Sequence, residues 1–497
     1  MGKSKVMDGP VYDAKSLGAG RVVVLGFQHM FAMFGSTVLV PALTGLSVSA
    51  TLLFAGLGTL LFHLISKRKV PAFLGSSFAF LAGYFAISGL EADGMTKAEL
   101  LPYACFGVAI AGLVYLVLAG LIKAFGVNRV MKFFPPIVTG PIIIAIGLCL
   151  SGTAINSCAT NWPIAIVAIL IIVICNIWGK GMIRITPILL GVLGACALCV
   201  FLALMNSRSV TIGSGDAAAN YLCIAGNSKL QLFSTASIQN IKDAAWFGSP
   251  FLYKDTVFNI FTSGTANSGL LLTSIITIVP ISLATIVEHI GDISAISSTV
   301  DRNFIKDPGL HRTLIGDGLA TTLASLFGAP ANTTYGENTG VLTLSKVYDP
   351  MVVRLAAVFA ICFSFSPKLA ACISAIPTPV VGGISLVLYG MISAVGVRNV
   401  VENQVDFSKS RNVIIAAIIL VLSIGITYSA AGSINFQIGT VAISLSGLAV
   451  GSLVGIILNA ILPGKDYVFE DKQEAAQSKN STLKSEPVHK EKDKGKK

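Results

Sequence analysis

Charged side chains are scarce in this sequence. Asp, Glu, Lys and Arg make up 12% of its 497 residues, 54% of the residues are hydrophobic, and the mean hydropathy is +0.79. A soluble domain carries about 25% charged residues. So little charge over this length excludes a soluble protein, because most side chains have no water to face. Apolar runs of about 18 residues or more recur along the whole chain, which predicts a polytopic membrane protein.

The motifs of soluble catalysts and metal proteins are also missing. Ser, His and Asp occur, but no GxSxG elbow, HExxH pair or phosphate-binding loop does, so we expect no enzyme. The nine cysteines are scattered singly without metal-ligand spacing, and we expect neither metal nor cofactor. Cys158 and Cys223 could both lie outside the membrane, where a disulfide between them would be allowed. Residues 1–20 contain no cleavable signal peptide, so the first span is expected to direct insertion.

The chain contains fourteen hydrophobic segments. The first apolar run is 22–43 and the last is 438–462. The segments begin near Arg21, Thr51, Phe73, Tyr103, Phe134, Trp162, Thr186, Gly269, His311, Gly336, Met351, Ile376, Arg411 and Ile438. An even number of spans puts both termini on one side of the membrane. Placing them in the cytoplasm assigns 29 of the 35 Lys and Arg to the inside, as the positive-inside rule requires.

This charge asymmetry reports orientation and gives no support for binding to nucleic acid, since no single face collects the basic residues. We therefore expect a cytoplasmic N-terminal segment at 1–20, a membrane domain at 21–462 and a disordered cytoplasmic tail at 463–497. One long outside loop, 206–268, interrupts the membrane domain. The expected location is the cytoplasmic (inner) membrane, where lipid surrounds the spans.

Two halves of the chain share the same order of motifs. Gln28-His29 in span one corresponds to Glu288-His289 in span eight, with an amide or a carboxylate beside a histidine in each. Polar, glycine-containing breaks follow at 75–78 and 333–338, and 134–140 resembles 376–383. Seven spans per half is an odd number, so the halves insert with opposite orientation. The pattern predicts an all-α membrane protein of seven plus seven inverted repeats.

The two polar breaks predict a binding cavity. A chain that leaves helical geometry at bilayer depth frees backbone groups at a cost of several kcal/mol each, unless protein or ligand satisfies them. The half-helices that follow offer bare N–H donors at their N-termini. Ser77 with Phe78, and Tyr335 with Gly336, are therefore candidates for hydrogen bonding to a substrate carbonyl.

Ionisable side chains inside spans are costly and indicate function. The candidates are His29, His63, Glu288, His289, Asp292, Asp317 and Glu337. Glu288 and Asp292 are four residues apart on one helical face, and two carboxylates so placed in a low dielectric cannot both ionise cheaply. One of them is expected to hold a proton near neutral pH, as a proton-coupled carrier requires.

For the remaining ionisable residues, structural roles are expected or compete with functional ones. His63, alone on an apolar span, is expected to be a packing residue with its hydrogen bond satisfied. His29 and His289 fit either support of the substrate site or hydrogen bonding between helices. Asp317, between two glycines, is expected to bond the break of a neighbouring span.

At these residues the sequence resembles the nucleobase–ascorbate transporter family, also called nucleobase–cation symporter-2, and within it the bacterial uracil permeases. The resemblance covers about 20–462. Its most specific stretches are 28–35, 75–80, 288–291, 307–312 and 332–338. The family signature, an acid or amide followed by Asn-x-Gly, is met by Glu337-Asn338-Thr339-Gly340, while its later Thr-basic pair is Ser345-Lys346 here.

The resemblance implies fourteen spans in a core domain (spans one to four and eight to eleven) and a gate domain (spans five to seven and twelve to fourteen). The substrate would lie between short extended stretches of spans three and ten. Glu288 and Glu337 would accept hydrogen bonds from N–H groups of the base. Backbone N–H groups of Phe78, Tyr335 and Gly336 would donate to its carbonyls, with Ser77 nearby. Residues expected to support the site or couple protons are Asp292, His289, Asp317, Gln28, His29 and Asn338.

The expected activity is import of a nucleobase together with protons, with uracil as the first choice. Asp292 stands where uracil permeases of the best-known type have histidine, and the purine-carrying branch commonly has aspartate there. Xanthine or another oxopurine is therefore the near alternative. An anion exchanger of the same seven-plus-seven architecture is a further alternative, against which Glu337 argues, since a basic residue is expected there. A homodimer is left open.

Overall fold

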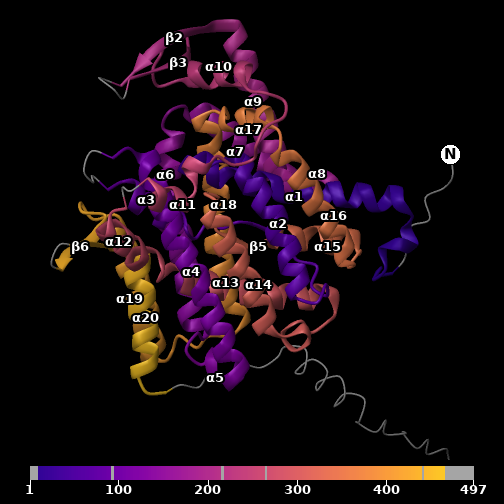
Figure 1. Cartoon of the computed structure of the whole chain (residues 1–497), viewed down its shortest axis with the longest axis vertical. Helices are drawn as coiled ribbons and strands as arrows, with labels where there is room; N and C mark the ends of the chain where they lie inside the picture. The colour runs from indigo at the N-terminus through magenta and orange to yellow at the C-terminus, as the bar shows by residue number, and fades with distance from the viewer. Residues whose placement is uncertain (1–8, 91–94, 214–217, 264–265, 439–440, 465–497) are drawn as a thin grey trace, which may run out of the picture.

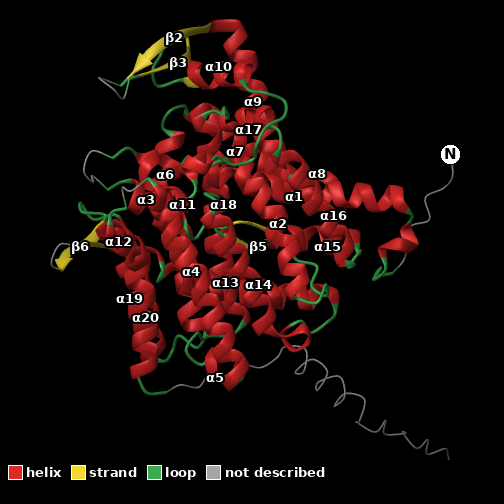
Figure 2. Cartoon of the chain, viewed as in Figure 1, coloured by secondary structure: helices red, strands yellow, loops and turns green. Residues whose placement is uncertain are grey.

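A computed structural model describes residues 9–90, 95–213, 218–263, 266–438 and 441–464. Over these residues the fold is mostly helical, with a few short strands (Figures 1 and 2). The first eight residues and the expected tail beyond Gly464 lie outside the described residues.

The helices of the first half follow the predicted hydrophobic segments. They are α1 (Ala19–Thr44), α2 (Val48–Ile65), α3 (Leu81–Ser88), α4 (Lys97–Phe125), α5 (Val127–Met131), α6 (Pro136–Cys158), α7 (Trp162–Ile177), α8 (Met182–Ile185) and α9 (Pro187–Asn206), after a 3₁₀ turn η1 (Ala14–Leu17). Local chemistry sets their starts: the Ser47 hydroxyl accepts from the N–H of Ala50 at α2, and Pro136 occupies the first turn of α6.

The second half repeats this helical pattern. Its helices are α12 (Ser268–Ile278), α13 (Ile281–Val300), α14 (Leu310–Leu326), α15 (Gly336–Ser345), α16 (Pro350–Ser364), α17 (Pro367–Ser374), α18 (Thr378–Glu402), α19 (Ser410–Thr427) and α20 (Gly447–Ile461), with a π-helical turn η4 (Ile305–Gly309) before α14. The Asp349 carboxylate caps α16 by accepting from the N–H of Met351 at 2.8 Å.

Several helices can cross a membrane. Within the described residues, seven helices are long and apolar enough to do so by length and composition, and nine spans result if two bent pairs each count as one. In these pairs α12 and α13 meet at 40°, and α16 and α17 at 89°. The apolar α7 and α20 are shorter, and α3 and α15 are half-helices next to the polar breaks. The chain is therefore a multi-pass membrane protein, while fourteen spans remains a prediction.

Helices from the two halves interleave. The helix α6 packs along α18, α4 along α14, and α2 along α16. The α6–α18 contact is close: a Cβ built on Gly147 would lie 2.1 Å from the carbonyl oxygen of Tyr389, and one on Gly396 would lie 2.6 Å from the nitrogen of Ile144. Glycine at such positions lets two helical backbones approach closely inside a membrane.

The start of the last span differs from the sequence prediction. An apolar helix from Ile438 was expected, but an antiparallel hairpin of β6 (Ser433–Ile438) and β7 (Val441–Ser446) occupies this stretch, and α20 begins at Gly447. The residues of β7 alternate small or polar side chains with Val, Ile and Leu, a two-residue period that favours a strand. The Ser446 hydroxyl then accepts from the N–H of Ala449 and starts the helix.

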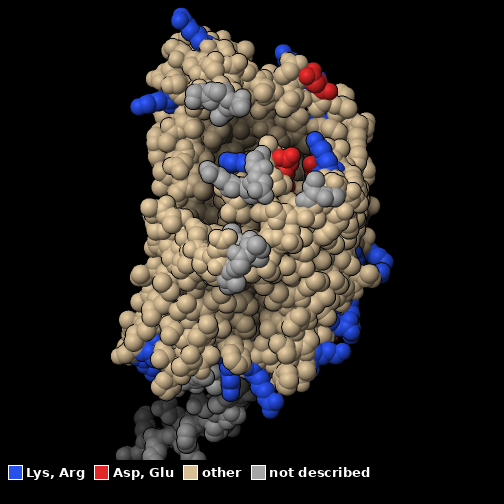
Figure 3. Space-filling view, turned by 60° about the vertical axis from the view of Figure 1, so that its left-hand side comes forward, with Lys and Arg blue, Asp and Glu red and all other residues tan. Residues whose placement is uncertain are grey.

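The long loop after α9 is folded. Strands β2 (Ser207–Ile212), β3 (Ala219–Ile224) and β4 (Gln231–Ser234) form an antiparallel sheet, followed by α10 (Thr235–Asp243), a 3₁₀ turn η3 (Tyr253–Asp255) and α11 (Val257–Thr262). The sheet and α10 stand beyond one end of the helices (Figure 1). Cys158 and Cys223 are both buried free thiols, so the disulfide considered for them is absent. On the face in Figure 3, Lys and Arg lie near both ends of the molecule, charged residues of both signs lie in a hollow near the upper end, and the surface between is largely uncharged.

Candidate functional site

Both polar breaks are short strands that pair with each other near the middle of the molecule. The strand β1 (Leu74–Ser76) runs antiparallel to β5 (Asn332–Thr334), with Gly75 opposite Thr333. All six strand residues are buried. The chain enters α3 after β1 and α15 after β5, so each half contributes one strand and one half-helix to the same place.

Side chains from neighbouring helices satisfy the backbone of these strands. The Thr59 hydroxyl of α2 accepts from the N–H of Leu74 at 2.9 Å, and the Thr321 hydroxyl of α14 donates to the carbonyl of Asn332 at 2.7 Å. The Asn332 amide in turn donates to the carbonyl of Phe54 at 2.9 Å. The cost of leaving helical geometry at bilayer depth is therefore offset by protein groups.

Side-chain contacts of Tyr335 and Ser76 hold the antiparallel pair of β1 and β5, called the strand crossing below, in place. The Tyr335 hydroxyl donates to the carbonyl of Ser76 at 2.8 Å, and the Ser76 hydroxyl donates to the carbonyl of Thr37 on α1 at 2.6 Å. The Tyr335 ring lies against the backbone of Gly75, where a Cβ would be 2.4 Å from the ring. Gly75 is thus required by space at this position.

One predicted backbone donor is already used. The N–H of Tyr335 donates to the carbonyl of Phe73 at 3.0 Å and extends the strand pair, so its expected donation to a substrate is wrong for this structure. The N–H of Ser77 likewise donates to the carbonyl of Ala331 at 2.8 Å. Among the described contacts, the N–H groups of Phe78 and Gly336 have no partner within the protein. These two groups are the backbone donors that the crossing presents.

The acidic residues of α13 lie beside the crossing. Glu288 and Asp292 are half-buried and one helical turn apart, and the backbone of Gly336 at the start of α15 lies near Asp292. The Thr334 hydroxyl donates to Oδ2 of Asp292 at 2.8 Å. This bond connects the end of β5 directly to a predicted proton-coupling residue.

Asp317 has a different partner from the one predicted. Its Oδ2 lies 3.1 Å from Nδ1 of His289, and both side chains are fully buried. The hydroxyls of Thr59 and Thr321 bond the backbone of the strand break instead. The imidazole of His289 can supply the N–H that a buried carboxylate needs. His289 also has Nδ1 3.5 Å from the Thr334 hydroxyl. The half-buried Asp292 and the buried Thr334, His289 and Asp317 thus form one continuous series of contacts.

The other histidines connect helices. The Asn338 amide of α15 lies 3.2 Å from Nδ1 of His29 and donates to the His29 carbonyl at 3.1 Å, so this pair links α1 to the half-helix after the break. Nε2 of His63 donates to the carbonyl of Ala72 at 2.8 Å in a buried position, as expected of a packing residue. Gln28 is half-buried on α1.

The Glu337 side chain lies outside the described residues. Its backbone belongs to the first turn of α15, directly after Gly336. The proposed role of this carboxylate therefore stays a prediction.

Sequence reasoning missed two contributors. Thr334 was within the predicted break but was given no role, although it bonds Asp292. Tyr389 of α18 places its ring against Phe78, edge to face, with centroids 6.4 Å apart. Phe78 follows the break in the first half, while α18 lies in the predicted gate domain, so only the three-dimensional packing reveals this contact.

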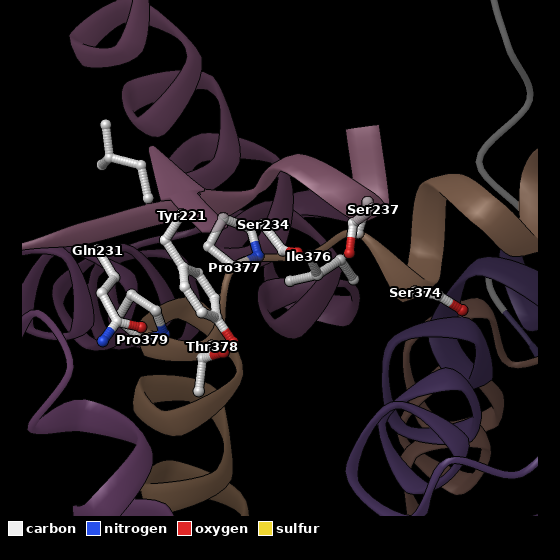
Figure 4. A pocket seen from close by; sticks show the side chains of 11 residues that line it. Tyr221, Gln231, Ser234, Ser237, Ser374, Ile376, Pro377, Thr378 and Pro379 are labelled. Atoms are coloured by element: carbon white, nitrogen blue, oxygen red, sulfur yellow. The ribbon is translucent and has the colours of Figure 1, made fainter. Parts of the chain in front are cut away.

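A cavity of about 200 Å³ lies elsewhere, between the outer sheet and the turn from α17 to α18. Figure 4 shows Tyr221 and Gln231 of the sheet facing Thr378 and Pro379 at the start of α18. Its lining is uncharged, and no residue of the predicted site contributes to it. This cavity is therefore separate from the strand crossing.

Two half-helices that meet at paired strands beside buried carboxylates define a secondary transporter with discontinuous spans. The family model Xan_ur_permease, described as Permease family, matches residues 20–432. The chain belongs to this family, the nucleobase–ascorbate transporters, and is a transporter rather than an enzyme.

Curated transport proteins are similar to this chain over almost its whole length. The chain is 37% identical to a uracil permease of Bacillus caldolyticus over 484 residues, which cover 95% of this chain and 99% of the relative. It is 33% identical to the uracil permease of Escherichia coli K12, covering 89% and 91%, and 34% identical to that organism's putative pyrimidine permease RutG, covering 92% and 93%.

Solved structures share the fold. The transmembrane domain of a cyanobacterium bicarbonate transporter, BicA, has a TM-score of 0.55 and 13% identity, covering 91% of this chain and 99% of that one. The structure of SLC26A9 also has a TM-score of 0.55, with 12% identity, covering 90% and 66%. At these identities the likeness shows the fold alone.

Proposed function

We propose that this protein imports a nucleobase together with protons, and that uracil is its preferred substrate. The observation that carries the proposal is the crossing of β1 and β5, which presents two backbone donors beside the acidic face of α13. Relatives named uracil permeases, 33–37% identical over most of the chain, support this choice of substrate.

The groups at the crossing match the edge of uracil. Uracil has two N–H donors and two carbonyl acceptors. Glu288 and Glu337 accept from the N–H groups, and the backbone N–H groups of Phe78 and Gly336 donate to the carbonyls, with Ser77 close by. Tyr335 contributes through its ring and hydroxyl, which hold the two strands together, since its N–H is engaged with Phe73.

Proton coupling is assigned to the series of buried groups behind this surface. Glu288 and Asp292 cannot both ionise cheaply in a low dielectric, so one of them carries a proton while the substrate is bound. Asp292 accepts from Thr334, which also touches His289, and His289 pairs with Asp317. A change of charge at Asp292 therefore acts directly on the strand that forms the substrate site.

The helix packing supports seven plus seven inverted repeats. If the second half repeats the first after seven spans, an internal two-fold axis exchanges span two with span nine and span four with span eleven. A contact between spans two and eleven then requires an equivalent contact between spans nine and four. The observed pairs α2–α16 and α14–α4 obey this exchange, as do α7–α9 and α19–α20. We infer on this basis that spans one to four and eight to eleven form a core and that spans five to seven and twelve to fourteen form a gate. The distribution of Lys and Arg supports placing both termini in the cytoplasm.

Xanthine or another oxopurine is the second candidate, favoured by one residue. Asp292 stands where purine carriers of the family commonly have aspartate. The fold shared with bicarbonate and SLC26 transporters gives no comparable reason for an anion, because the half-buried carboxylates of α13 would repel it.

Uptake of a panel of labelled bases tests the proposal. A transport-null cell expressing the chain is expected to accumulate uracil above the level of cells with an empty vector. Accumulation of xanthine with no accumulation of uracil would make xanthine the substrate and exclude uracil. Accumulation of neither base would refute nucleobase transport.

A further inference from the structure

A cavity of about 190 Å³ opens far from the nucleobase site. It lies where the start of α6, the connection from α18 to α19 and the end of α20 meet. These elements come together at the end of the molecule marked by α5 in Figure 1. The residues that matter for its chemistry are Lys132, Ile137, Asp406, Lys409, Arg411 and Asn459.

The cavity has an excess of positive charge. Lys132, Lys409 and Arg411 line it, against the single carboxylate of Asp406. Oδ1 of Asp406 accepts from the hydroxyl of Ser408 at 2.6 Å and from its N–H at 2.9 Å, which holds the pKa of Asp406 below its usual value. Asp406 is therefore ionised and also interacts with Lys409, and one carboxylate against three cations leaves the cavity lining with an excess of positive charge.

The arginine is fixed in place before any ligand arrives. Nη2 of Arg411 donates to Oδ1 of Asn459 at 2.7 Å and to the Asn459 carbonyl at 3.1 Å. The Asn459 amide donates to the carbonyl of Lys132 at 3.1 Å. This network connects α19, α20 and the segment before α6. Because the Arg411 side chain is already ordered, binding an anion costs little additional side-chain entropy.

The N-terminus of α6 adds to the positive potential. Pro136 occupies the first position of this 23-residue helix, and the N–H groups of Val138 and Thr139 both donate to the carbonyl of Pro135. Ile137, which lines the cavity, has no protein acceptor for its N–H among the described contacts. The positive end of a helix dipole favours phosphate groups.

Two exposed aromatic residues follow cavity-lining residues directly in the sequence. Phe133 follows Lys132 and is 51% exposed, and Phe407 follows Asp406 and is 43% exposed. Exposed aromatic rings on a membrane protein are typical of the boundary between headgroups and acyl chains. Free phosphate or a soluble phosphate ester would gain nothing from such neighbours, whereas a phospholipid would contact both the basic cavity and the rings.

We propose that this cavity binds the phosphate headgroup of an anionic phospholipid, with Lys132, Lys409 and Arg411 facing the phosphate and Phe133 and Phe407 against the acyl chains. Basic pockets between transmembrane helices bind anionic headgroups by the same chemistry. The lipid bridges three elements of the predicted gate domain at the membrane surface. The proposal does not depend on which base is transported.

Lipid binding to the purified full-length protein tests the proposal. The protein is titrated in a neutral detergent with phosphatidylglycerol or phosphatidylcholine and bound lipid is measured by native mass spectrometry. The variant K132Q/K409Q removes the two exposed cations and leaves the Arg411 network, while K123Q/K180Q removes two exposed lysines elsewhere. We expect phosphatidylglycerol to bind at least tenfold more tightly than phosphatidylcholine, and K132Q/K409Q alone to lose about tenfold.

Two results would overturn the proposal. One is equal binding of phosphatidylglycerol by the wild-type protein and K132Q/K409Q, with thermal melting confirming that both are folded. The other is complete displacement of phosphatidylglycerol by millimolar inorganic phosphate, which would make free phosphate the ligand. Uracil uptake is measured on the same variants, so failure of the lipid site is distinguishable from failure of the transport function.

Discussion

The Thr334 hydroxyl donates a 2.8 Å hydrogen bond to Oδ2 of Asp292, across a sequence separation of 42 residues. Thr334 ends the strand β5 that crosses β1, and Asp292 belongs to the acidic face of α13. The position of β5 and the charge of the half-buried Asp292 carboxylate are thus coupled through one hydroxyl. The proposed coupling of protons to transport depends on this hydrogen bond.

Replacing Thr334 by valine removes the hydroxyl and keeps the shape. A hydrogen bond to a charged group is worth about 1.5–3 kcal/mol, so uptake efficiency is expected to fall by about tenfold or more. Thr333→Val is the matched control, because the neighbouring Thr333 hydroxyl is buried without a partner among the described residues. Initial rates of labelled uracil uptake, normalised to protein in the membrane, measure both. Equal losses in the two variants would contradict a specific role for Thr334.

Energy coupling has a direct signature. If uptake is coupled to protons as proposed, uracil uptake is expected to rise as the external pH falls and to collapse when a protonophore is added. Uptake in sodium-free buffer serves as the control for the coupling ion. Sodium-dependent uptake that ignores the protonophore would remove the proton hypothesis.

Glu337→Gln tests the second predicted acceptor. The amide keeps the shape and gives up a charge-assisted bond, so the affinity for uracil is expected to fall tenfold or more. His63→Ala is the comparison, since the only described hydrogen bond of the His63 ring is to the Ala72 carbonyl, so its loss should affect stability far more than affinity. Calorimetry in detergent measures both affinities. Wild-type affinity in Glu337→Gln would take this residue out of the site.

Gly75→Ala tests whether the strand crossing is as tightly packed as described. The added methyl group would lie 2.4 Å from the Tyr335 ring and 2.7 Å from the Thr37 hydroxyl, so melting in detergent is expected to shift downward by the equivalent of about 1–3 kcal/mol. Gly390→Ala, in α18 with nothing within 4 Å of the added atom, is expected to leave the melting temperature close to that of the wild type. Similar melting of Gly75→Ala and wild-type protein would contradict the packing.

Sequence patterns located most of the apolar helices and the two breaks, because hydrophobicity and helix-breaking residues act locally. They failed where partners are distant. Asp317 was expected to bond a strand break, but its partner is His289, and nothing near Asp317 in the sequence identifies a histidine on another helix. The N–H of Tyr335 was expected to donate to the substrate, but it donates to the carbonyl of Phe73, in the segment before β1.

The start of the last span was wrong for a different reason. Mean hydropathy over 438–462 does not distinguish an apolar strand from an apolar helix, and the two-residue alternation of Val441–Ser446 was the signal for the hairpin. Neither hydropathy nor residue periodicity could have identified Tyr389, because its ring contacts Phe78 only across the predicted boundary between core and gate.

The most direct test is competition for labelled uracil uptake by unlabelled uracil, xanthine and hypoxanthine. An ionised carboxylate at Glu337 can only accept hydrogen bonds, which suits the N–H edge of uracil. The imidazole ring of a purine adds a ring-nitrogen acceptor that a carboxylate cannot serve, and a ligand that leaves a buried polar group unpaired loses about 1–3 kcal/mol. We predict that xanthine needs a concentration roughly ten to a hundred times higher than uracil for equal inhibition, and that Glu337→Gln narrows this gap. Xanthine competing as well as uracil would contradict the assignment of a pyrimidine substrate.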